Sequence, residues 1–112
     1  MENNNFAGSE GSPISLALAA TWTKNYRDNN PGQTIAHFFG TDIIQQILSQ
    51  GTCMGIRIYY AADDSGAKQL ILVGADAHQN DMTDGILADY SMPCPAICST
   101  ANPLNSVITV IS

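Results

Sequence analysis

GIRIYYAADDSGAKQLILVGA, residues 55–75, carries the strongest structural signal in this chain. Two runs rich in β-branched, aromatic and aliphatic residues flank the polar group DDSG at 63–66. Runs of this kind joined by a short turn sequence indicate a β-hairpin. The return run, QLILVGA at 69–75, is apolar at successive positions, so it is expected to be covered on both faces. We therefore predict a central strand there, with a helix or another subunit as its second cover.

The first run of the hairpin alternates in character along its length. Ile56, Ile58 and Tyr60 are expected to face a core, and Arg57 and Tyr59 are expected to face outward. Tyrosine and arginine are enriched at interface hot spots. The interface candidates predicted within the hairpin are Arg57, Tyr59, Ile71 and Val73.

Two helices are predicted outside the hairpin. The first begins at Pro13, with Ser12 as its N-cap, and ends in the run RDNNPG at 27–32 because a residue before proline avoids helical geometry. Its apolar stripe recurs at every fourth residue: Ile14, Leu18, Trp22 and Tyr26. The second helix is predicted to have Thr41 as its N-cap, and its stripe comprises Ile43, Ile44, Ile47 and Leu48.

The rest of the chain completes an α+β prediction. Prolines at 93, 95 and 103 predict irregular structure up to residue 104, and SVITVIS at 106–112 predicts a terminal strand. Such a strand pairs with its own sheet or with the edge of a neighbouring one, which adds Val107 and Thr109 to the interface candidates. We expect two helices packed on a small, mostly antiparallel β-sheet.

The predicted domain organisation is a polar N-terminal tail, residues 1–11, followed by a single α+β domain, residues 12–112. The tail is rich in glycine, serine and asparagine, a composition typical of flexible segments. Either its own domain or a neighbouring copy must hold such a tail in order. The low charge of the chain favours a neighbouring copy.

Composition limits the classes of partner. Charged residues make up 12 % of the 112 residues and hydrophobic residues 45 %, and so little charge favours association between copies into a homo-oligomer. Four basic against ten acidic residues give a net charge of −6. Phosphate repels such a surface, so no nucleic acid partner is expected, whereas a basic protein fits. No apolar run is long enough to span a membrane, and we expect a cytoplasmic protein.

The segment SMPCPAICST, residues 91–100, holds two of the three cysteines. Cys94 and Cys98 have C-x3-C spacing, unlike the C-x-x-C of thioredoxin-like or zinc-ribbon sites. The favoured interpretation is a proline-stiffened turn whose thiols are structural and stay reduced, because cytoplasmic thiols are kept reduced. The alternatives are a disulfide or redox site, and a metal site completed by Cys53 or His78.

The loop DAHQNDMTD, residues 76–84, collects several oxygen and imidazole donors. Its beginning is similar to a calcium-binding loop, with Asp76 and His78 as candidate ligands, but Leu87 stands where the bidentate glutamate belongs. The favoured interpretation is a solvated loop. No cofactor is predicted, and a divalent cation bound by this loop is the alternative.

The sequence carries none of the nucleophile-elbow, phosphate-loop or zinc-protease motifs, so a non-enzymatic protein is expected. Three functions stay open. The favoured one is a structural or interaction protein that self-associates through its apolar strands and its ordered tail. The alternatives are a small acidic inhibitor or immunity-type module that binds a basic protein, and a small thiol- or metal-dependent enzyme or sensor.

Overall fold

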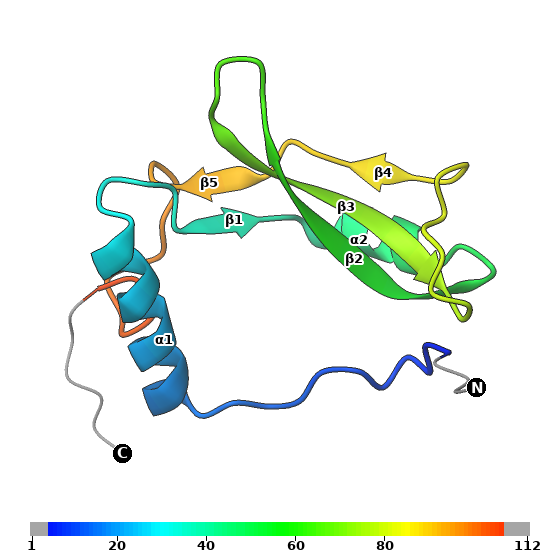
Figure 1. Cartoon of the computed structure of the whole chain (residues 1–112), viewed down its shortest axis with the longest axis horizontal. Helices are drawn as coiled ribbons and strands as arrows, with labels where there is room; N and C mark the ends of the chain where they lie inside the picture. The colour runs from blue at the N-terminus through cyan, green and yellow to red at the C-terminus, as the bar shows by residue number, and fades with distance from the viewer. Residues whose placement is uncertain (1–4, 107–112) are drawn as a thin grey trace. The chain divides into compact units, whose positions relative to one another are not determined.

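The computed structural model describes residues 5–106 and has the predicted α+β class, with two helices and antiparallel strand pairs (Figure 1). These residues form two compact units. The sheet unit comprises residues 5–11 and Phe39–Ser91, and the ribbon unit comprises Ser12–Phe38 and residues 92–106. That residues 12–112 form one domain stays a prediction.

The sheet unit contains one helix and a three-stranded antiparallel sheet. Strands β2 (Cys53–Ala62) and β3 (Lys68–Asp76) form the predicted hairpin, paired from Cys53↔Asp76 to Ala62↔Lys68. Strand β4 (Leu87–Ala88) pairs with the far side of β3, so the sheet order is β2-β3-β4. The prediction of a central strand at 69–75 is confirmed, and β2 is an edge strand among residues 5–106.

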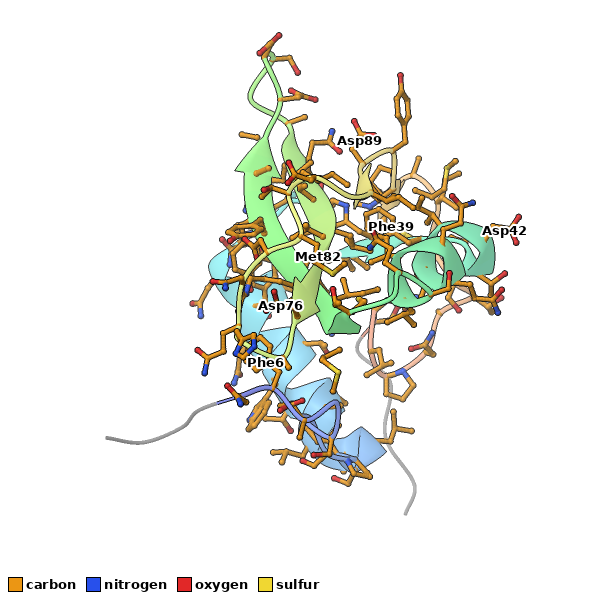
Figure 2. All side chains as sticks on the ribbon, turned by 90° about the vertical axis from the view of Figure 1, so that its right-hand side faces the viewer. Phe6, Phe39, Asp42, Asp76, Met82 and Asp89 are labelled. Atoms are coloured by element: carbon orange, nitrogen blue, oxygen red, sulfur yellow. A yellow bond between two sulfur atoms is a disulfide. The ribbon has the colours of Figure 1, made fainter. Side chains whose placement is uncertain are left out.

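Helix α2 (Thr41–Leu48) begins one residue earlier than predicted, since Gly40 and not Thr41 is its N-cap, and its apolar stripe packs on one face of this sheet. Ile47 is completely buried against Leu72 of β3 and Ala88 of β4. Burying an isoleucine contributes about 1.5–3 kcal/mol, so this contact stabilises the helix on the sheet. Figure 2 shows Phe39 on the strand side of α2 and Asp42 on its outer side.

The prediction that Ile58 and Tyr60 face the core is wrong. Ile56 packs on the core as expected, but Ile58 is 55 % exposed and Tyr60 is 94 % exposed. The eight residues of α2 span about 12 Å, whereas the ten residues of β2 span about 33 Å. The core nevertheless continues along the central strand through Leu72 and Leu70, the cross-strand partners of Ile58 and Tyr60, so it is the edge strand β2 that is left uncovered beyond Ile56.

Gln50 joins α2 to the segment before β4. Its side-chain nitrogen donates to the Ile47 carbonyl at 2.9 Å, and its side-chain oxygen accepts from the Ile86 N–H at 3.0 Å. Gly85 makes this bridge possible, because a methyl group there would lie 2.1 Å from the same oxygen. The amide therefore satisfies the Ile86 N–H and adds a second donor to the Ile47 carbonyl, which also accepts from the Gln50 N–H at 3.4 Å.

The carboxylate of Asp63 organises the hairpin turn. One oxygen accepts from the Ser65 N–H, the Ser65 hydroxyl and the Ala67 N–H, and the other accepts from Gln69. These donors favour the ionised form. Above all through the Ser65 hydroxyl, they lower the pKa of Asp63 to about 2.

The ribbon unit contains helix α1 (Leu16–Asn29) and two short strands. The helix begins later than predicted, because Ser15 is its N-cap and accepts from the Leu18 N–H at 3.1 Å. It ends before Pro31, as predicted. Arg27 near its end donates to the Leu104 carbonyl at 2.7 Å, which attaches the segment after the prolines to the helix.

The prediction that the prolines exclude regular structure is wrong at Pro93. This residue is the centre of β5 (Met92–Cys94), which pairs antiparallel with β1 (Ala36–Phe38), with His37 opposite Pro93. In the described part of the ribbon unit there are two strands, so each has one edge without a strand neighbour there. Proline is tolerated on such an edge because its missing N–H is not needed there.

We expect Gly85→Ala to destabilise the protein by about 1–3 kcal/mol, the usual cost of overpacking. The added methyl group must displace the Gln50 amide and break its bridge. Urea unfolding followed by circular dichroism measures the change. Gly51→Ala is the control, since a methyl group there meets no atom within 4 Å; equal losses from both variants would contradict the role of the bridge.

We expect Asp63→Asn to reduce stability near neutral pH by a margin that shrinks in acid. The folded pKa of Asp63, about 2, lies below an unfolded value of roughly 3.9. Its stabilising effect is therefore complete above the unfolded value and is lost as the pH falls toward the folded one. Thermal unfolding across this range tests the expectation, with Asp64→Asn at neutral pH as the charge control. A margin that stays constant on acidification would contradict it.

Candidate functional site

Arg57 and Tyr59 project from the face of β2 opposite to α2, as their alternation predicts. Cross-strand partners share a face of a sheet, and these two residues lie opposite Val73 and Ile71 on β3. Asp81 reaches the same face from the loop after β3, where it forms an isolated bridge with Ala75. Three polar side chains from two separate stretches of the chain therefore meet here.

Asp81 holds both of its neighbours. Its Oδ1 accepts from Arg57 Nη1 at 2.5 Å, and its Oδ2 accepts from the Tyr59 hydroxyl. Arg57 Nη1 also donates to the Gln79 carbonyl at 3.1 Å. The hydrogen bond from Tyr59 and then the Arg57 cation lower the pKa of Asp81, and the bond to Asp81 raises the pKa of Tyr59. The arrangement keeps a carboxylate ionised and a phenol protonated, which is suited to holding a surface in shape.

The N-terminal segment 5–11 packs on the sheet of its own chain. The Phe6 ring lies 5.3 Å from the Arg57 guanidinium, a cation–π distance, and the Phe6 N–H donates to the Ala77 carbonyl at 2.8 Å. Glu10 closes the segment by accepting from the Ala7 and Gly8 N–H groups at 2.8 and 3.0 Å, and the Ala7 bond is the main cause of its lowered pKa. The expectation that a neighbouring copy orders this tail is therefore wrong for residues 5–11.

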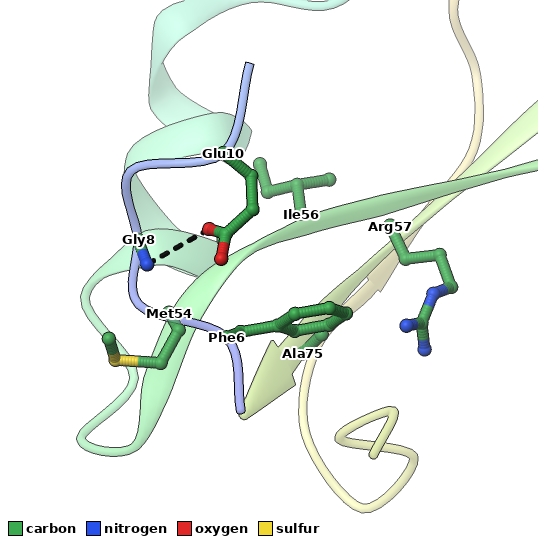
Figure 3. Close-up of a pocket in the computed structure, with 8 residues that line it drawn as sticks. Phe6, Gly8, Glu10, Met54, Ile56, Arg57 and Ala75 are labelled. Carbon is green, nitrogen blue, oxygen red and sulfur yellow. Dashed lines mark hydrogen bonds between the residues drawn. The ribbon is translucent and has the colours of Figure 1, made fainter. Parts of the chain in front are cut away.

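A cavity of about 320 Å³ lies between this segment and the start of β2 (Figure 3). Its two charged side chains are already engaged. Figure 3 shows the Glu10 carboxylate turned toward Gly8, and Arg57 is bonded to Asp81 and Gln79. A ligand site needs polar groups that converge on the ligand, so we assign this cavity to the docking of the segment. The lining residues are Phe6, Gly8, Glu10, Met54, Gly55, Ile56, Arg57 and Ala75.

Cys94 and Cys98 form a disulfide in the ribbon unit, with their Cα atoms 4.8 Å apart. The favoured prediction of reduced structural thiols is wrong, and the disulfide alternative is the one observed. The turn of residues 94–98 brings the two Cα atoms within the usual disulfide range. Disulfides are rare in the cytoplasm, so this bond counts against the predicted cytoplasmic location, which stays a prediction.

The remaining metal candidates are engaged elsewhere. Asp76 Oδ1 accepts from the His78 and Asn80 N–H groups and holds the turn after β3, while the exposed His78 lies in that turn. Cys53, which is a free thiol, donates to the Gly55 carbonyl at 3.1 Å. Within residues 5–106, no three His, Cys, Asp or Glu side chains are placed to hold a metal ion.

The interface candidates differ in their exposure. Tyr59 is partly exposed, Ile71 is half-buried, and Val73 is only 2 % exposed, so the chain itself already covers Val73. Val107 and Thr109 lie outside the described residues.

The most exposed apolar side chains of the hairpin are Ile58 and Tyr60, which the alternation assigned to the core. They share the core face with their partners Leu72 and Leu70, which do pack on the core, so alternation gave the correct face but not how far the core extends over the edge strand.

Comparisons of the chain with protein-family models, with curated proteins and with solved structures find no significant match. Among the described residues, neither helix has the length and apolar character needed to cross a bilayer.

We expect Asp81→Ala to lower the pKa of Tyr59 toward the ordinary tyrosine value. The substitution removes the hydrogen bond and the negative charge that hold the phenol proton, and it leaves the Arg57 cation nearby. Tyrosinate absorbance during alkaline titration measures the shift, with Tyr59→Phe identifying the signal. Asp84→Asn is the control for a lost loop charge, and an unchanged Tyr59 titration in Asp81→Ala would contradict the assignment.

Proposed function

We propose that this is a non-enzymatic interaction protein that self-associates, and that the outer edge of β2 is the contact. The observation that carries the proposal is the position of β2 at the end of the sheet order. Among residues 5–106, no strand pairs with its outer side. An edge strand presents unpaired N–H and C=O groups, which another strand can satisfy.

The exposed edge lacks the usual protection against pairing. Natural edge strands are protected by prolines, bulges, short lengths or several charges. Residues 56–62 contain no proline, their only charge is that of Arg57, and the irregularity between Cys53 and Gly55 lies before them. Ile58 and Tyr60 are exposed on this stretch, so pairing would also bury apolar side chains.

We expect Tyr60→Lys to weaken self-association about tenfold or more, as loss of an interface hot spot does, without affecting the fold. A lysine on an edge strand opposes strand addition, and an almost fully exposed side chain contributes little to the core. Light scattering of the untagged protein over a concentration series measures the association against the 11.9 kDa chain mass.

The matched control is Tyr90→Lys, which makes the same substitution at a tyrosine that is 89 % exposed and lies after β4. Its association is expected to equal that of the wild type. A wild-type protein that stays monomeric at high concentration would overturn the proposal, and so would equal weakening by both variants.

The distribution of charge favours a second candidate, a basic protein partner. Nine of the ten acidic residues but only two of the four basic ones lie in residues 1–11 and 39–91, which gives that part a net charge of −7. Such a field would accelerate the capture of a cationic protein. Salt separates the two candidates, because screening relieves repulsion between like copies and weakens attraction to a basic partner.

The third function, a thiol- or metal-dependent enzyme or sensor, has less support. The disulfide leaves Cys53 as its remaining thiol. Light scattering with and without reductant tests it within the same experiment. A mass that changes on reduction of the disulfide would favour a redox sensor over assembly through a strand edge.

A further inference from the structure

We propose that two copies pair their β2 strands antiparallel about a two-fold axis at Tyr59, which joins both three-stranded sheets into one. This inference rests on the proposed self-association and assigns its partner and register.

The free edge of β2 has defined limits. At its start, the N-terminal segment lies close to the strand: a methyl group on Gly8 would meet the Met54 carbonyl oxygen at 3.5 Å. At its end, the turn organised by Asp63 begins directly after Ala62. Residues 56–62 are therefore open, and Tyr59 is their midpoint. A two-fold axis there pairs the whole open stretch with its copy.

The direction of the backbone N–H and C=O groups along β2 agrees with this axis. In an antiparallel pair, alternate residues direct their backbone groups toward the partner strand and away from it. The Asp63 N–H donates to the Ala67 carbonyl. Counting back by twos from Asp63, the backbone groups of residues 61, 59 and 57 therefore also point toward β3. The groups at residues 56, 58, 60 and 62 then point outward. The axis at Tyr59 places residue 58 opposite residue 60 of the partner subunit, and 56 opposite 62, so that outward groups meet.

The side chains also match about this axis. Ile58 lies opposite Tyr60 of the partner subunit, so each of the exposed apolar side chains of the edge meets another. Arg57 lies opposite Ala61 of the partner subunit, and the acidic turn after Ala62 lies opposite the strand start up to Gly55 of the partner subunit. No two charges of the same sign on the paired strands therefore face each other. If the pairing register between the two β2 strands moved by one residue, side chains of one sheet face would lie opposite those of the other face. If it moved by two residues, the paired stretch of the two strands would be shorter.

Cysteine scanning tests the register. In a Cys53→Ser background, Ile58→Cys, Tyr59→Cys and Tyr60→Cys are each oxidised with glutathione disulfide, which accepts the two electrons of the new bond. Only residues on the axis approach to about 4.5 Å between Cα atoms, inside the disulfide range. Position 58 or 60 is about 8 Å from its own copy. We expect Tyr59→Cys to cross-link at least about tenfold faster than the others, measured by non-reducing electrophoresis and peptide mass mapping.

A second variant is needed because Tyr59→Cys removes the hydrogen bond from Tyr59 to Asp81 and so changes the strand whose register it reports. The double variant Ile58→Cys/Tyr60→Cys keeps Tyr59 and should cross-link between the two positions. An assembled protein that cross-links fastest at single position 58 or 60, or at none, overturns the register and leaves self-association standing. A protein that light scattering finds monomeric overturns the proposed function itself.

Discussion

The pairing of β2 with β3 is the constraint on which the other features of the sheet unit depend. Its register sets which residues share a face, because the side-chain period of a strand is two. Leu72 is thereby directed at α2, and Arg57 is directed to the opposite face, where it meets Asp81. The same pairing presents the Ala77 carbonyl to the N-terminal segment. A slip of one residue would undo all of these contacts together.

The sheet is well covered at one end and open at the other. The Gln50 bridge and the N-terminal segment lie toward the half of the hairpin that holds the start of β2 and the end of β3, and the core contacts of β2 end at Ile56 whereas those of β3 extend to Leu70. The half near the turn has no such cover over Ile58 and Tyr60. Its stability depends on cross-strand pairs and on the hydrogen bonds of Asp63. The surface that is the least used for folding is thus the one that is free for association.

Local patterns predicted the hairpin, the central strand and the facing of Arg57 and Tyr59, since each follows from residues within one strand or turn. The exposure of Ile58 and Tyr60 did not follow from alternation, because it depends on how far the core extends over the edge strand. The role of Asp81 was missed for a similar reason: the loop after β3 must fold back before this carboxylate meets Arg57. The disulfide depends on the path of a proline-rich turn, for which the spacing of Cys94 and Cys98 gives no rule. The strand at Pro93 has three residues and depends on β1, far away in the sequence.

The division of the ribbon unit between two distant segments has a consequence for the order in which the chain folds. Phe38 and Met92 are paired, yet all of Phe39–Ser91 lies between them. On a ribosome, β1 is made well before β5, whereas α2 and the hairpin form one continuous stretch. The contacts of that stretch are closer in sequence and cost less loop-closure entropy, and its compaction shortens the loop that the ribbon must close. The pairing of β1 with β5 is therefore expected to form after the hairpin, because it joins residues much farther apart in the sequence.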